Sequence, residues 1–428
     1  MSSTPAPVTA WARNGRTTMP LPRFGRSVTL EQAYEQQRDN AFNFLRLCFA
    51  LLVMVGHAGV IGWGPGHEPV RMLIDTGGVA VTGFFGLSGF LISRSGRRTG
   101  AVRFIWHRAL RIFPGYWVCL VLTAFLLAPL LYWYEHDTLN DFLDTGSGPL
   151  GYVFHNFLTD QRQPDVARVT HDAAFAGAIN GSLWTLKTEL TCYLLVLGLA
   201  ITTLLRRARW TVLVLGAVLL AVIVADTVRG PVEPGPLADV HSIHLPVLGW
   251  YLLFYLVAFG LAFVLGMAAD LYRAAIPLND ALGVAALLLV ALSLWLGWPL
   301  FGPFLVAFVY LLLWAGIRLP KALRRIGRRN DYSYGVYIYA FPIQQALAIF
   351  RLPRYGWTLY LLTSVAAVLA VAAGSWHLVE KPMLRLKDWT PRHRPTVPAQ
   401  PTVPAQPTVP AQRDGDEPVA SPPAGAPV

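Results

Sequence analysis

The feature that most constrains the fold is a series of apolar runs, each about 20 residues long, the length that an α-helix needs to cross a bilayer. Of the 428 residues, 54% are hydrophobic and 14% charged, against about a quarter charged in soluble proteins. We therefore expect an all-α, polytopic transmembrane helix bundle of about ten spans. The seventh and eighth runs, which nearly touch, form either two spans or a re-entrant pair. The runs lie near 42–62, 78–94, 113–134, 183–204, 210–228, 248–268, 280–297, 300–317, 333–351 and 356–378.

Basic residues gather in alternate loops, which predicts the orientation of the bundle. The opposite loop from Glu135 to Gly181 carries several acids. We therefore expect a multi-pass plasma-membrane protein with both termini in the cytosol. The net charge of +11 follows from this orientation and does not indicate a nucleic-acid partner. The three most basic loops contain Arg94, Arg97, Arg98, Arg103, Arg108 and Arg111, then Arg206, Arg207 and Arg209, then Arg318, Lys321, Arg324, Arg325, Arg328 and Arg329.

Polar segments flank the membrane domain expected at 41–388. Residues 1–40 are rich in Pro and Arg and are expected to form a cytosolic, largely disordered arm. Residues 389–428 are Pro/Ala-rich, and a Pro density of this kind predicts an extended, disordered cytosolic tail. A docking role for the tail is the alternative. The hexapeptide PTVPAQ repeats there at 395–400, 401–406 and 407–412.

Two ionisable residues, Arg46 and His57, interrupt the first apolar run. Eleven positions correspond to about three helical turns plus 20°, so both side chains share one face, roughly 16 Å apart along the axis. Ionisable groups inside a membrane are costly and usually functional. In the predicted orientation Arg46 lies near the cytosolic face and His57 in the outer half. The alternative is a snorkelling arginine and a histidine that only packs.

Glu189 on the fourth span lies about two turns from the outer surface, at a depth similar to that predicted for His57. A carboxylate in the same cavity would orient the imidazole and favour its protonated form. The histidine could then take a proton from a hydroxyl as a general base. In the alternative interpretation Glu189 pairs with Lys187 and only anchors the helix.

Arg108 and Arg111 are three positions apart and therefore neighbours on one helical face. Two guanidiniums in register suit a phosphorylated ligand, although an ordinary positive-inside loop gives the same pattern.

The second span carries three glycines, Gly83, Gly86 and Gly89. Their spacing favours close packing against another helix. The alternative is a broken helix that lines a cavity.

The ninth span carries a series of tyrosines, followed by two glutamines and interrupted by Pro342, which predicts a kink. This composition is more typical of a polar cavity wall than of an interface belt. The residues concerned are Tyr332, Tyr334, Tyr337, Tyr339, Gln344 and Gln345.

Motifs of soluble enzymes and metal sites are missing from the sequence. There is no phosphate-binding GxxxxGK, no nucleophile elbow and no HExxH, so no metal is expected. The three cysteines all lie in apolar runs and are interpreted as small buried residues, not as a disulfide set. They are Cys48, Cys119 and Cys192.

Together these blocks resemble the acyltransferase-3 family of integral membrane O-acyltransferases, over roughly 40–388. Arg46, ten residues and His57 are similar to the family's Arg-x10-His signature. The remaining blocks follow in the family's order: Gly83-Phe-Phe-Gly-Leu-Ser-Gly-Phe-Leu-Ile, Arg108-Ala-Leu-Arg111 before Ile-Phe-Pro, Ser182-Leu-Trp-Thr-Leu with Glu189 and Tyr193, and Leu378-Val-Glu-Lys-Pro.

The resemblance implies transfer of an acyl group, usually acetyl, from cytosolic acetyl-CoA or another acyl-CoA to a hydroxyl of a surface polysaccharide or lipid-linked glycan. It implies that His57 is the catalytic base and that Arg46, Arg108 and Arg111 lie near the CoA phosphates. From depth and charge we add Glu189 as the partner of His57, and Ser88 or a ninth-span tyrosine as a donor to the oxyanion. The expected partners are membrane lipid, acyl-CoA and a hydroxylated acceptor.

Two alternatives stay open at this point. One is acylation of a secondary metabolite such as a macrolide, which some relatives perform. The other is a glycan or solute transporter, although the sequence has no evident inverted repeat. Ala340 also stands where many relatives have a histidine, which removes a second proton carrier and leaves the acceptor class open.

Overall fold

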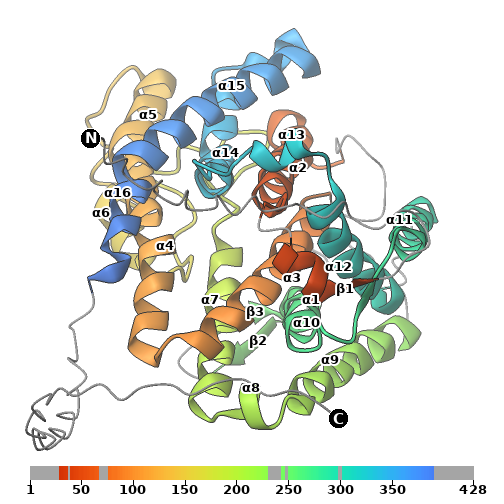
Figure 1. Ribbon diagram of the computed structural model, residues 1–428. Coiled ribbons are helices and arrows are strands. Elements are labelled where there is room, and N and C mark those ends of the chain that lie inside the picture. The colour runs from red at the N-terminus through yellow and green to blue at the C-terminus, as the bar shows by residue number, and fades with distance from the viewer. Residues whose placement is uncertain are drawn as a thin grey trace, which may run out of the picture. The chain divides into compact units, whose positions relative to one another are not determined.

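The computed structural model describes residues 28–36, 39–66, 76–229, 242–245, 249–296 and 301–389. These residues are mainly helical, which confirms the all-α membrane fold (Figure 1). The tail expected at 389–428 lies outside this range except for Trp389, so its disorder stays a prediction, as does that of most of the N-terminal arm.

The helices follow the apolar runs closely. The main helices are α2 (Phe42–Trp63), α3 (Thr76–Arg98), α4 (Ala101–Leu122), α5 (Ala128–His136), α7 (Trp184–Ile201), α9 (Trp210–Arg229), α10 (Leu253–Leu271), α11 (Asp280–Trp295), α12 (Phe301–Arg318), α14 (Ser333–Ile349) and α15 (Trp357–Ser375). Shorter helices are α1 (Leu30–Gln36), α6 (Pro149–His155), α8 (Leu204–Arg207), α13 (Lys321–Arg325) and α16 (Lys381–Leu384). The π-helical turns η1 (Thr123–Leu127) and η3 (Trp376–Glu380) continue α4 and α15, and the 3-10 turns are η2 (Leu352–Tyr355) and η4 (Arg385–Asp388).

Two short antiparallel ribbons complete the described fold. β1 (Val28–Thr29) pairs with β4 (Pro277–Leu278), with Val28 opposite Leu278. β2 (Ser242–Leu245) pairs with β3 (Gly249–Leu252), with Ser242 opposite Leu252. Part of the segment expected as an arm is thus folded: after β1, α1 buries Leu30 and Ala33 completely.

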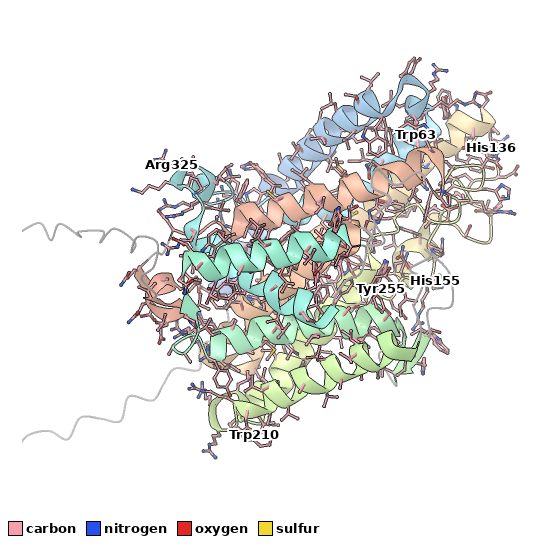
Figure 2. All side chains as sticks on the ribbon, turned by 90° about the vertical axis from the view of Figure 1, so that its right-hand side faces the viewer. Trp63, His136, His155, Trp210, Tyr255 and Arg325 are labelled. Carbon is pink, nitrogen blue, oxygen red and sulfur yellow. The ribbon has the colours of Figure 1, made fainter. Side chains whose placement is uncertain are left out.

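Among the described residues, six helical segments are long and apolar enough to cross a membrane. They are Phe42–Trp63, Thr76–Arg98, Ala101–His136, Trp184–Ile201, Leu253–Leu271 and Trp357–Asp388. Three shorter apolar helices also match expected spans: Trp210–Ala225, Asp280–Trp295 and Gly302–Arg318. The protein is therefore a membrane protein, and the total of ten spans stays a prediction. Trp63 and His136 lie at one end of the bundle and Trp210 and Arg325 at the other (Figure 2).

Close packing of α3 against α10 explains the glycines of the second span. A Cβ atom on Gly89 would overlap the backbone carbonyl of Phe263, and one on Gly266 would overlap that of Gly86. Only glycine allows two helix backbones to approach this closely. The packing interpretation of these glycines is therefore confirmed, and the two helices lie side by side in the bundle (Figure 1).

The segment that follows α5 packs against the helices. Tyr116 on α4 donates a hydrogen bond to the backbone oxygen of Asn156, 2.5 Å away, and Asn156 is fully buried. Trp117 on the same helix donates to the backbone oxygen of Phe157 at 3.1 Å. The start of this segment is therefore fixed to α4.

Side-chain amides fasten the rest of this segment to α14. Asn180 Nδ2 donates to the Ile338 oxygen at 3.0 Å, and Gln345 Nε2 donates to the oxygens of Phe175 and Ala178 at 2.6 and 2.9 Å. The segment from Asn156 to Asn180 is thus held against the helices, while charged side chains such as those of Arg162 and Asp172 stay exposed. Its expected place outside the membrane stays a prediction.

The α3–α10 contact predicts a large effect from a single methyl group. Gly89→Ala should lower the free energy of unfolding by about 1–3 kcal/mol or more, because the added methyl group meets backbone that cannot move aside. The measurement is thermal unfolding of the purified protein in detergent. Gly198→Ala is the matched control: no atom lies within 4 Å of its added Cβ, so it should melt at or slightly above the wild-type temperature. Equal melting temperatures for the two variants would contradict the packing argument.

Candidate active site

A cavity lies between α2, α3, α7 and α14. Its wall combines aromatic side chains with hydroxyl groups, one arginine and one carboxylate, which is the mixture expected of a small-molecule site. This wall includes Ser88 and two tyrosines of the ninth span, Tyr334 and Tyr337. Their hydroxyls are among the oxyanion donors that the sequence predicts. The lining residues are Arg46, Val81, Phe84, Phe85, Ser88, Thr185, Leu186, Glu189, Ser333, Tyr334 and Tyr337.

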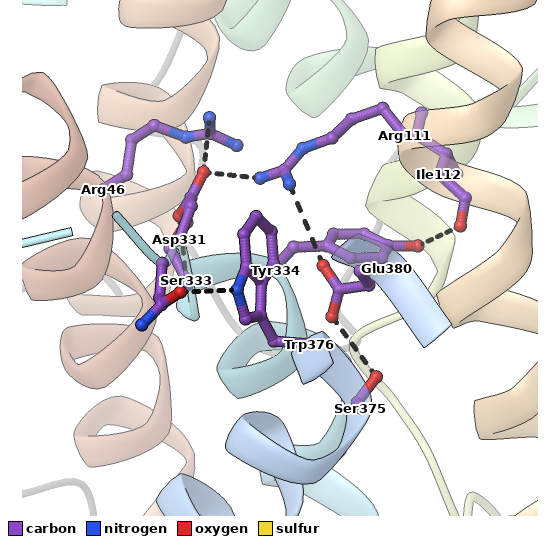
Figure 3. A network of polar contacts seen from close by, with 10 residues as sticks. Arg46, Arg111, Ile112, Asp331, Ser333, Tyr334, Ser375, Trp376 and Glu380 are labelled. Atoms are coloured by element: carbon purple, nitrogen blue, oxygen red, sulfur yellow. Dashed lines mark hydrogen bonds and ion pairs between the residues drawn. The ribbon is translucent and has the colours of Figure 1, made fainter. Parts of the chain in front are cut away.

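A network of buried charges joins the helices at the Arg46 end of the cavity. Asp331 Oδ2 lies 3.3 Å from Arg46 Nη1 and 2.6 Å from Arg111 Nη2, so one carboxylate bridges two arginines (Figure 3). Arg111 Nη1 lies 3.8 Å from Glu380 Oε2, and Ser375 donates to Glu380 Oε1 at 3.2 Å. The structure therefore brings together Arg46 and Arg111, as the sequence predicts.

The Asp331 carboxyl is ionised at any physiological pH. Burial acts to raise its pKa, but the guanidiniums of Arg111 and Arg46 and the hydrogen bonds from Ser333 outweigh burial and lower the pKa to about 2. The carboxylate therefore balances the positive charge of the two arginines at this end of the bundle.

Arg108 differs from its neighbour Arg111. Its guanidinium carbon lies 5.8 Å from the centre of the Tyr193 ring and 6.0 Å from that of Phe104. Among the described residues it forms no ion pair, and its buried Nε has no hydrogen-bond partner. Of the three arginines named from the sequence, Arg108 thus keeps a charge that no carboxylate of the described chain neutralises.

Glu189 accepts a short hydrogen bond from the hydroxyl of Tyr193, one turn further along α7. Lys187 instead pairs with Asp160, with 2.7 Å between Nζ and Oδ1. The alternative in which Glu189 pairs with Lys187 is therefore wrong, because the two side chains point away from each other around the helix. Glu189 faces the cavity.

His57 lies beyond the cavity, away from Arg46. Its half-buried ring packs edge-on against Phe341, with ring centroids 5.2 Å apart. Phe341 follows the cavity residue Tyr337 by four positions, about 6 Å along α14. Phe341 also contacts Phe175 of the segment from Asn156 to Asn180, at 5.5 Å between ring centroids. His57 is not among the residues that line the cavity, so the structure does not show the expected shared His57–Glu189 cavity.

The ninth span divides into two parts with different roles. Tyr334 and Tyr337 line the cavity: the Tyr334 hydroxyl donates to the Ile112 oxygen at 2.7 Å, and that of Tyr337 lies 3.0 Å from the Ser182 oxygen. Gln344 instead donates to the Met54 oxygen at 3.0 Å, and Gln345 donates to the Phe175 oxygen at 2.6 Å. Two of the four predicted tyrosines therefore line the cavity, whereas Tyr332, Tyr339 and the glutamines do not.

Sequence reasoning missed Asp331 and Glu380 as members of the site. Both stood in blocks already singled out, one at the start of the ninth span and one in the closing Leu-Val-Glu-Lys-Pro block. One signal could have identified them: an acidic residue at the end of an apolar span, when other spans carry arginines without an acidic partner.

No group of three His, Cys, Asp or Glu side chains among the described residues could hold a metal ion.

Comparison with known proteins agrees with this architecture. The acyltransferase-domain family matches residues 39–379. The chain is 30% identical over 363 residues to an O-acetyl transferase of Shigella phage Sf6, covering 81% of this chain and 96% of the relative. It is also 29% identical over 384 residues to nodulation protein 10 of Rhizobium leguminosarum bv. viciae, covering 81% and 94%. No solved structure matches the chain.

The family match extends over most of the sequence and includes every helix that lines the cavity or carries the bridged arginines. The chain belongs to the acyltransferase-3 family and is a membrane acyltransferase.

Proposed function

We propose that the protein is an O-acetyltransferase that moves an acetyl group from cytosolic acetyl-CoA to a hydroxyl of a surface polysaccharide or lipid-linked glycan. The observation that supports this best is a hydroxyl-lined cavity with arginines at one end and a histidine beyond the other. The acetyl group is inferred from the phage relative, whose name specifies O-acetyl transfer. Acylation of a secondary metabolite stays the alternative, because neither relative's name identifies the acceptor.

The donor is proposed to enter at the arginine end. CoA carries several phosphates, and guanidinium groups bind phosphate oxygens in bidentate fashion. Arg108 is the strongest candidate because its charge is uncompensated within the described chain, and Arg46 and Arg111 lie at the same end. The pantetheine arm would then extend along the cavity toward Tyr337.

The chemistry is proposed to occur where the cavity approaches His57. The imidazole takes the proton of the acceptor hydroxyl while the hydroxyl oxygen attacks the thioester carbonyl. The tetrahedral intermediate then collapses, its C–S bond breaks, and the CoA sulfur leaves with the proton from the imidazolium. The hydroxyl of Tyr337, one helical turn from Phe341 on α14, is the proposed donor to the oxyanion.

The position of His57 adds one requirement to this mechanism. The rings of Phe84 and Tyr337 meet edge-to-face in the cavity wall, with centroids 5.9 Å apart, and Phe341 lies beside the histidine. The thioester must therefore pass these rings to reach the imidazole. An aromatic passage suits a narrow, uncharged pantetheine arm and disfavours the charged end of CoA.

Removal of the proposed base tests the chemistry. His57→Ala should reduce acetyl transfer by about a hundredfold or more, since general-base catalysis contributes 10²–10⁴-fold. The measurement is incorporation of labelled acetyl from acetyl-CoA into the glycan and lipid fraction of membranes that contain the protein. His136→Ala is the control, because the described contacts of His136 are local: it stacks on Tyr132 at the end of α5, and its Nδ1 lies 3.0 Å from the Tyr132 oxygen. Normal transfer by His57→Ala would exclude His57 as the base.

Removal of one guanidinium tests the donor end. Arg108→Ala should raise the KM for acetyl-CoA by about tenfold or more, because a charge-assisted contact to phosphate is lost. Arg103→Ala is the matched control: Arg103 forms an exposed ion pair with Asp388, which contributes little. An unchanged KM in Arg108→Ala, measured in the same membrane assay, would contradict the phosphate role.

A further inference from the structure

Asp331 connects three parts of the bundle that are far apart in sequence. Its Oδ2 atom meets Arg46 of α2 and Arg111 of α4, while the residue itself directly precedes α14 (Figure 3). The side chains of Asp331, Arg46 and Arg111 are 14%, 21% and 15% exposed. An ion pair this well buried keeps a defined geometry, unlike one on an open surface.

The carboxylate is itself held in one orientation. The backbone N–H and the hydroxyl of Ser333 both donate to Asp331 Oδ1, at 3.2 and 2.5 Å. Oδ1 is thus occupied, and Oδ2 is the oxygen that faces the two guanidiniums. A free arginine side chain has considerable rotamer entropy, which a ligand must otherwise overcome on binding. The fixed carboxylate removes that freedom before any ligand arrives.

The local charges also explain why the arginines differ from one another. Two arginines and two carboxylates alternate through Arg46, Asp331, Arg111 and Glu380, so this part of the network is close to neutral. Arg108 is three residues from Arg111 on the same helical face and is left with its charge uncompensated within the described chain. The pairing thus leaves one arginine available beside two that are fixed.

We propose that Asp331 is a positioning residue of the donor site. It holds Arg46 and Arg111 in a preformed arrangement at the Arg46 end of the cavity, so that the anionic part of acyl-CoA binds without reordering them. This inference rests on the proposed function, because it takes acyl-CoA as the donor. Preorganisation of this kind raises affinity by removing the cost of ordering side chains. Asp331 acts through the arginines and need not touch the donor.

A second aspartate in the same protein provides a matched control. Asp270 at the end of α10 also bridges two arginines: it pairs with Arg97 and, at 3.1 Å, with Arg273. Its side chain is 1% exposed, and it does not line the cavity. Asp270→Asn therefore removes the same chemical group from the same kind of bridge, away from the proposed donor site.

The test is CoA binding by the purified full-length protein in lipid nanodiscs, measured by displacement of radiolabelled CoA and needing no acceptor. Asp331→Asn should weaken CoA binding by about tenfold or more, because the two guanidiniums are then ordered only when the ligand binds. Asp270→Asn should stay within about twofold of wild type. Pantetheine, which lacks the phosphates, should bind Asp331→Asn as it binds wild type, whereas general damage to the fold would weaken both ligands.

Several outcomes would overturn the inference. If Asp331→Asn binds CoA with wild-type affinity, or loses CoA and pantetheine affinity equally, Asp331 does not position the donor site. If Asp331→Asn does not fold, the CoA-to-pantetheine affinity ratio of Asp331→Glu decides: a reduced ratio supports the inference, and the wild-type ratio overturns it. If wild-type protein binds no CoA, the proposed function itself fails, so the two failures are distinguishable.

Discussion

Charge compensation inside a membrane bundle is the constraint on which the site depends. Guanidiniums within spanning helices are costly unless anions lie beside them. Asp331 and Glu380 meet this requirement for Arg46 and Arg111, and they do so by joining α2, α4, η3 and the start of α14. The contacts that offset the free-energy cost of burying these arginines therefore also fix where the helices lie relative to one another at this end of the cavity.

A second set of contacts holds the segment from Asn156 to Asn180 against the helices. Gln345 donates to the carbonyl of Phe175, and Asn180 donates to the Ile338 carbonyl of α14. Phe175 lies against Phe341, which in turn packs against the ring of His57. The ring contacts of His57 are thus aromatic whereas the arginine end is charged, an asymmetry that suits an anionic donor on one side and a hydroxylated acceptor on the other.

Much of this could be predicted because membrane helices are encoded locally. Hydropathy and length located the ends of α2 to within one residue and those of α7 to within three, and the spacing of Arg46 and Arg111 from their helix ends placed both at one end of the bundle. The role of Gly89 was also accessible, since a small residue on a spanning helix usually marks a close helix contact. In each of these cases the information needed for the prediction lies within a single segment of the sequence.

What could not be predicted depends on which segments meet. The partner of Glu189 was chosen by depth alone, whereas the structure gives it Tyr193 on its own helix and places His57 about one turn beyond the cavity. The contacts that hold the chain near Asn156 against α4 and α14 also escaped prediction, because hydrogen bonds between distant segments leave no local pattern in the sequence.

The sequence by itself determined the membrane class, the helices and the set of ionisable residues within them, because the cost of placing apolar or charged groups in lipid is a property of each segment. Only the tertiary structure decided that Asp331 stands between Arg46 and Arg111 and that Arg108 stays without a carboxylate partner in the described chain. Such pairing depends on distances between segments hundreds of residues apart. The energy of an ion pair depends on the separation of the two charges and on their burial, and composition specifies neither.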